Sequence, residues 1–192
     1  MDFSTIVDTF EQMELTSSRL VLTEYLVSLL KKTPTEIIDR VIYLIQGKLH
    51  PDYEGIELGM AEKMAIRAIS LSTGLDTVSI EQVYRKTGDL GDTAGEVMKS
   101  KNQTTLFTEK MTVERVYLTL DKIARSGGMG SQDAKLRLLS SLLSDATSRE
   151  SRYIMKFIMG TLRLGVADYT VIDALTLAFT ADKSNRQLLE HA

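Results

Sequence analysis

The sequence predicts an all-α fold, a globular array of about ten or more helices, from its composition and from the spacing of its apolar residues. Two prolines and no tryptophan in 192 residues suit helices better than a β fold rich in turns. Apolar residues recur every three or four positions, as in Phe3, Ile6, Val7 and Phe10, which is typical of amphipathic helices that face a common core. No alternation typical of β-strands runs along the chain.

Capping residues and glycines indicate where the helices begin and end. Thr33-Pro34-Thr35-Glu36 predicts a capping box that starts a helix over 34–46. Thr147-Ser148-Arg149-Glu150 predicts a second capping box, at the start of a helix over 148–162, and Asp168 is a candidate cap for one over 169–180. We expect further helices over the ranges 60–73, 79–88, 92–99, 112–125, 131–144 and 184–190. Residues 100–111 read as a connecting loop, which would allow two pseudo-related halves.

The length and composition of the chain limit the class of protein that it can be. A chain of 192 residues can form one domain, and we expect a single all-helical domain over residues 1–192. With no cysteine, no signal peptide and no apolar run of membrane-spanning length, the chain reads as cytoplasmic, with no membrane partner.

The formal net charge of −3 conceals an uneven distribution along the chain. Residues 84–165 carry 14 Lys and Arg against 9 Asp and Glu, whereas residues 1–83 carry 7 against 13. Such a basic stretch can present a local patch to phosphates, and it is equally typical of a solvated helix surface.

Few residues could carry catalysis. The histidines are His50 and the penultimate His191, and no nucleophile motif such as Gly-x-Ser-x-Gly occurs. His50, Asp52 and Glu57 lie within eight residues and could hold a divalent metal in a small metal-dependent enzyme, but a polar loop between helices explains the same pattern. We therefore expect no catalytic residue and no metal site in this chain.

Three helix junctions combine glycines with nearby cations. Gly127-Gly128-Met129-Gly130-Ser131 lacks the context of a P-loop, but it would expose backbone N–H groups at the positive end of a helix, with Lys135 one turn further on. The other junctions are 88–91, beside Arg85, and 162–168. Backbone amides and cations placed in this way can bind a sugar-phosphate backbone without reading bases, although each junction also fits an ordinary helix connection.

Short motifs follow one another along nearly the whole chain. They are Ser17-Ser18-Arg19-Leu20, Leu49-His50-Pro51, Lys86-Thr87-Gly88-Asp89-Leu90-Gly91, Met111-Thr112-Val113, Gly130-Ser131-Gln132-Asp133-Ala134-Lys135 and Gly160-Thr161-Leu162-Arg163-Leu164-Gly165-Val166-Ala167-Asp168. In this order and spacing they resemble the N-terminal DNA-binding domain of ATP-dependent DNA ligases of the archaeal and eukaryotic replicative type. The last motif is the most specific.

The resemblance implies an all-α domain that binds nicked double-stranded DNA from the minor-groove side, without sequence preference, in DNA replication, repair and recombination. It implies that DNA is contacted by Arg19 and Arg163 and by the turns that hold Gly127, Gly130, Ser131, Leu164 and Gly165. Lys135 is a further candidate for the same role, and the weaker candidates are Arg152, Lys101 and Gly91.

Ligases of this type continue into a nucleotidyltransferase domain, with a Lys-x-Asp-Gly motif, and an OB-fold. No Lys-x-Asp-Gly occurs here. We therefore expect a fragment of a longer ligase that is inactive alone and whose partners are nicked DNA and its own downstream domains. The full reaction would use ATP and Mg²⁺ to join a 3′-hydroxyl to a 5′-phosphate.

The alternative is a helical protein-interaction scaffold. DNA binding requires Arg19, Arg163 and the turn at 127–131 to converge on one face, whereas a scaffold requires an exposed apolar groove.

Overall fold

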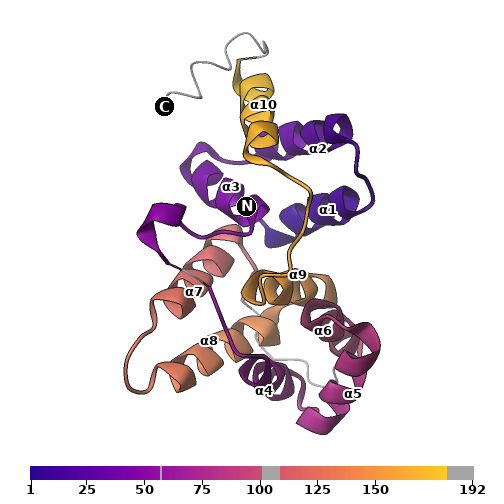
Figure 1. The fold of residues 1–192 in the computed structure, drawn as a ribbon, viewed down its shortest axis with the longest axis vertical. Coiled ribbons are helices and arrows are strands. Elements are labelled where there is room, and N and C mark those ends of the chain that lie inside the picture. Colours follow the sequence, from indigo (N-terminus) through magenta and orange to yellow (C-terminus); the bar gives the residue numbers. More distant parts are fainter. Residues whose placement is uncertain (57, 101–108, 181–192) are drawn as a thin grey trace.

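The computed structural model describes residues 1–56, 58–100 and 109–180, and within these ranges it contains ten α-helices and no β-strand (Figure 1). The predicted all-α fold is confirmed. The helices are α1 (Phe3–Glu14), α2 (Arg19–Lys32), α3 (Ile38–Gln46), α4 (Glu62–Thr73), α5 (Thr77–Thr87), α6 (Leu90–Lys99), α7 (Val113–Arg125), α8 (Ser131–Asp145), α9 (Ser148–Ile158) and α10 (Asp168–Phe179). None of these described helices is long and apolar enough to cross a membrane.

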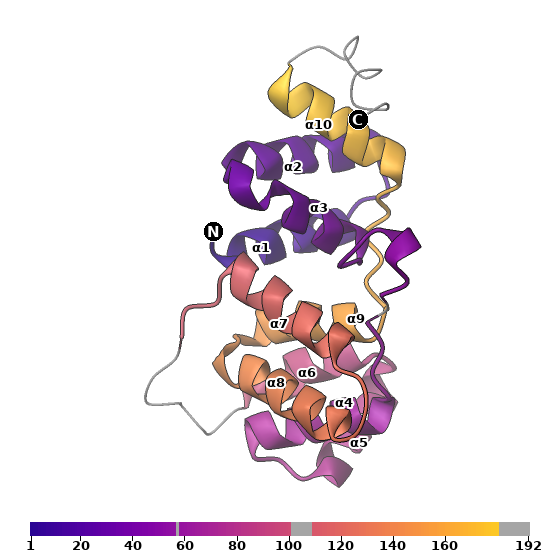
Figure 2. The ribbon, with the colours of Figure 1, turned by 90° about the vertical axis from the view of Figure 1, so that its left-hand side faces the viewer.

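The helices form two groups that share one hydrophobic core (Figures 1 and 2). Helices α1, α2, α3 and α10 lie at one end of the molecule, and α4 to α9 lie at the other. The chain crosses between the groups through residues 47–61, before α4, and returns through residues 159–167, after α9. Because α10 packs on α2, the end of the described chain lies against its beginning.

The connection at 100–111 does not divide the fold, which corrects the division that the sequence allowed. Helix α8, which follows this connection, packs against α4, which precedes it, and α6 packs against α9 in the same way. Buried apolar faces that pair across the connection place both sides of it in one core.

Local signals located most helix boundaries, with three corrections, the first of which is that α9 ends at Ile158 instead of at residue 162. The capping box at Thr147 is confirmed, since its side chain accepts from the Glu150 N–H and the Glu150 side chain accepts from the Thr147 N–H. The box predicted at Thr33 is wrong, because this hydroxyl donates to the Leu29 carbonyl at 2.9 Å and ends α2. Asp168 is the first residue of α10 rather than its cap. The helix predicted over 184–190 lies outside the described residues.

Candidate nucleic-acid interface

Residues 159–167, which join α9 to α10, run along one edge of the molecule, on the right-hand side of Figure 2. Leu162 and Leu164 are buried and anchor this segment, which leaves Arg163 between them on the surface. Gly165 adopts φ +69°, and a Cβ atom there would lie 3.7 Å from Leu22 in α2. The segment therefore passes beside the first turns of α2.

Arg19 reaches the same edge from the first position of α2. Its Nη2 donates to Asp173 Oδ2 in α10 at 2.9 Å, while 62% of its side chain stays exposed. Arg163 is exposed, and its Nη1 donates to the Leu162 carbonyl at 2.9 Å. The segment that carries Arg163 and the helix that begins with Arg19 are therefore neighbours at this edge.

The turn between α7 and α8 lies on the same right-hand side of Figure 2 but toward the opposite end of the molecule, and Figure 1 shows it displaced sideways from the segment between α9 and α10. Gly128 and Gly130 have φ of +80° and +81°, a backbone conformation that glycine adopts without strain. Gly130 is the N-cap of α8 and provides no capping side chain, so the first N–H groups of this 15-residue helix carry its positive end toward solvent. Ser131 begins the helix, and the half-buried Lys135 has no ion-pair partner among the described residues.

The weaker candidates do not join this edge. The Arg152 guanidinium pairs with Glu14 at 2.7 Å and with Asp92 at 2.6 Å, so its charge is already compensated. Gly91 is buried between α6 and α9, where a Cβ atom would lie 2.4 Å from Lys156 Cγ. Arg152 and Gly91 therefore serve helix packing, and Lys101 lies outside the described residues.

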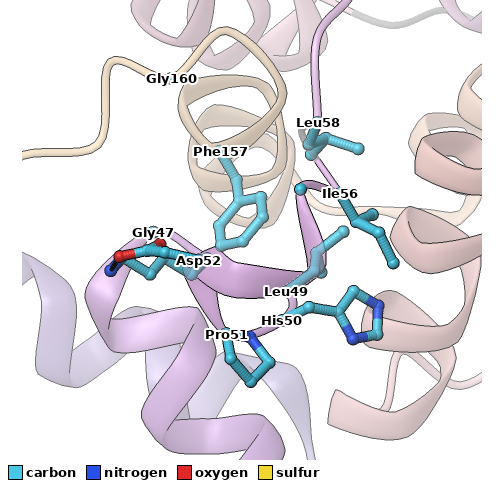
Figure 3. A pocket seen from close by; sticks show the side chains of 11 residues that line it. Gly47, Leu49, His50, Pro51, Asp52, Ile56, Leu58, Phe157 and Gly160 are labelled. Atoms are coloured by element: carbon cyan, nitrogen blue, oxygen red, sulfur yellow. Dashed lines mark hydrogen bonds and ion pairs between the residues drawn. The ribbon is translucent and has the colours of Figure 1, made fainter.

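A pocket of about 410 Å³ separates residues 47–58 from the C-terminal end of α9 (Figure 3). The His50 ring points away from Asp52, toward α7, where its Nε2 lies 2.5 Å from Asp121 Oδ1, while Asp52 pairs with Lys48 at 2.6 Å. Glu57 lies outside the described residues, and within them no cluster of three His, Asp or Glu could hold a metal ion. The geometry gives the metal-dependent enzyme no support.

His50 instead fixes the loop that leads toward α4. Burial alone would raise the pKa of Asp121, but hydrogen bonds from His50 and Arg125 outweigh it and lower this pKa. Arg125 is the last residue of α7, and its Nε lies 2.8 Å from the same oxygen of the Asp121 carboxylate. The contacts of Asp121 with His50 and Arg125 therefore also fix the start of the turn that leads into α8.

The large apolar side chains exposed in the described part of the chain are spread over both groups of helices. They are Leu15, Leu20, Tyr53, Leu71, Val78, Leu118, Met129, Tyr169 and Phe179. They come from α2, α4, α5, α7, α10 and three connecting segments, a distribution unlike the continuous groove that a helix-binding scaffold needs.

Two contacts at the edge could not be found from the sequence. Asp173 holds Arg19 from 154 residues away, and Gln46 Nε2 donates to Asp168 Oδ1 at 2.9 Å across 122 residues. Asp168 therefore ties the start of α10 to the end of α3 instead of capping its own helix. No periodicity or short motif links such distant residues.

The fold defines a class: an all-α domain in which the segment carrying Arg163 lies beside the start of α2 and α8 begins without a capping side chain. The chain belongs to the family described as DNA ligase N terminus, whose model matches residues 2–176, and the family resemblance is confirmed. It is 56% identical over 192 residues to the DNA ligase of Nitrosopumilus maritimus and 55% identical to that of Cenarchaeum symbiosum. It is 45% identical over 199 residues to DNA ligase 2 of Thermofilum pendens. These alignments cover 100% of this chain and 33% of each relative.

Proposed function

We propose that this chain is the DNA-binding domain of an ATP-dependent DNA ligase, and that it binds nicked double-stranded DNA without sequence preference. Arg19 and Arg163 would enter the minor groove, while the turns at 127–131 and 163–166 contact phosphates. The observation that supports this best is that the segment carrying Arg163 packs beside the start of α2, which carries Arg19, while the uncapped start of α8 lies on the same side of the molecule in Figure 2.

The chemistry of these groups suits a surface that must accept any sequence. Arginine in the minor groove responds to groove width and negative potential more than to base identity, and contacts to phosphates carry no sequence information. Because buried leucines hold Arg163 on both sides, its backbone is fixed before DNA arrives. Less ordering is then required on binding.

Joining of the strands would belong to other parts of the ligase. The chain spans a third of its relatives, and we propose that the remainder contains the nucleotidyltransferase and OB-fold domains, which use ATP and Mg²⁺.

The test is a binding titration of the 192-residue chain with fluorescently labelled nicked duplexes of several sequences. We expect the affinity to fall as salt rises and to be similar for all sequences. Arg163→Ala should weaken binding to every duplex about equally, by about 1–3 kcal/mol.

Lys31→Ala is the matched control. It removes the same charge from an exposed position near the opposite end of α2, roughly 18 Å along the helix from Arg19. Its affinity should match that of the unmodified chain. Absence of binding to nicked duplex, a sequence-selective loss in Arg163→Ala, or equal losses in the two variants would each refute the proposal.

A further inference from the structure

The ion pair between Arg19 and Asp173 is asymmetric. Asp173 Oδ2 accepts from Arg19 Nη2 at 2.9 Å, and the two side chains are 16% and 62% exposed, respectively. The carboxylate is therefore largely covered by protein, whereas the guanidinium lies at the surface. Both residues stand on helices that pack against each other, so the anchor point of each side chain is fixed.

We propose that Asp173 is a positioning residue, which holds the Arg19 guanidinium in the orientation that DNA binds. This inference rests on the proposed function, since it assumes that Arg19 contacts DNA. A guanidinium has five N–H donors in a planar fork, and the contact with Asp173 uses one oxygen and one nitrogen. The remaining donors are available on the exposed side, where a phosphate or a base edge can approach without displacing the carboxylate.

Two effects of Asp173 on DNA binding oppose each other. An arginine held in place before binding loses less rotamer freedom when DNA arrives, which favours binding. The carboxylate also repels phosphate, but across a guanidinium the two charges are roughly 7 Å apart, where repulsion in water is about equal to thermal energy and is reduced further by salt. Ordering a long side chain opposes binding by as much as this or more, so the positioning effect outweighs the repulsion.

The experiment compares Asp173→Ala with Asp173→Asn in the 192-residue chain, with nicked duplex as the probe. Asp173→Ala removes the acceptor, and we expect it to weaken binding by about 2- to 10-fold, the effect of ordering one long side chain. Asparagine keeps an acceptor oxygen at the same place and should restore the affinity to within about 2-fold. In an Arg19→Ala background, Asp173→Ala should have no further effect.

Glu24→Ala is the matched control, because Glu24 carries the same charge on α2, the helix of Arg19, but is exposed and makes no ion pair among the described residues. It should not weaken binding. Thermal unfolding of each variant checks that α10 stays packed.

Four outcomes would overturn the inference. Tighter binding by both Asp173 variants would make the carboxylate a competitor of DNA. An equal loss in the Arg19→Ala background would show that Asp173 acts through another group. If Arg19→Ala bound like the unmodified chain, Asp173 would have no DNA-binding arginine to position, and the proposed contact of Arg19 would fall, while the binding of nicked duplex by the domain would stand. An unmodified chain that does not bind nicked duplex would overturn both.

Discussion

Replacing Gly91 with alanine tests whether this glycine serves helix packing. A Cβ atom at this position would lie 2.4 Å from Lys156 Cγ and 2.7 Å from the Arg152 carbonyl oxygen, both in α9. Lys156 cannot swing aside freely, because its side chain is buried and its Nζ lies 3.3 Å from Asp89 Oδ1. Helices α6 and α9 would have to move apart.

The expected change in the free energy of unfolding is the difference between two opposing effects. Forcing an extra carbon into a packed contact destabilises a protein by about 1–3 kcal/mol, and the clash with backbone places Gly91→Ala near the upper end of that range. Alanine in a helix interior returns about 1 kcal/mol relative to glycine. A net loss of about 1–2 kcal/mol should lower the Tm by roughly 2–8 °C for a domain of this size.

Thermal unfolding followed by circular dichroism measures this shift against two controls. Gly95→Ala lies in the same helix and gains the same helix propensity. Its Cβ would lie 3.2 Å from Arg152 Cβ, a tight contact that offsets this gain, so we expect a Tm near that of the unmodified chain. Gly127→Ala meets no atom within 4 Å and should also be neutral. The packing interpretation fails if Gly91→Ala unfolds at the same temperature as Gly95→Ala, or if it loses DNA affinity well below its Tm.

Two further predictions concern stability. Thr147→Ala removes a hydroxyl that caps α9, and it should lower the free energy of unfolding in urea by about 1 kcal/mol; an unchanged midpoint would refute the role of this cap. The folded pKa of Asp121 lies below the ordinary value of 3.8, so its stabilisation is complete above that value and is lost as pH falls through the folded pKa. The urea concentration at the unfolding midpoint should therefore decrease when the pH is lowered below about 4, and it should decrease less in Asp121→Asn. An equal decrease in that variant would exclude Asp121 as a source of the pH dependence.

The features that sequence could predict are those decided within one turn of helix. Thr147 and Glu150 are three residues apart, so their mutual hydrogen bonds depend on little else. At Thr33 the same capping-box motif does not form a capping box, because the Thr33 hydroxyl donates to the Leu29 carbonyl of the preceding helix instead. The helix-bounded turns at 127–131 and 163–166 could be located for the same local reason.

The surface was less predictable, because exposure depends on which helices meet. Arg152 fitted the pattern of a surface cation until α1 and α6 brought Glu14 and Asp92 to it. Gly91 fitted the pattern of a hinge, although the approach of α9 makes it a packing position. The partner of Arg19 depends on the return of the chain to α2 after 154 residues, which no local pattern encodes.

Ion pairs within the fold also change how the basic charge of residues 84–165 should be interpreted for DNA binding. Residues 84–165 contain 14 cations, but many of them are neutralised by carboxylates within the fold. The paired cations include Arg115, Arg125, Arg149, Arg152 and Lys156. Part of the charge of this basic stretch is thus engaged in ion pairs, so its composition overstates the charge that faces a ligand.

The salt dependence of binding measures how many cations displace counterions from the DNA, whether they lie in the minor groove or at a phosphate. Arg19, Arg163 and Lys135 are the exposed or half-buried cations that the proposal assigns to DNA binding. Each phosphate neutralised contributes roughly −0.9 to the slope of log K against log salt concentration, so three contacts predict a slope of about −3 for this chain on duplex DNA. Titrations between 50 and 300 mM salt would measure it, and Arg163→Ala should make the slope about one unit shallower. A slope steeper than about −6 would require cations beyond these three, and it would refute the small footprint inferred from the ion pairs.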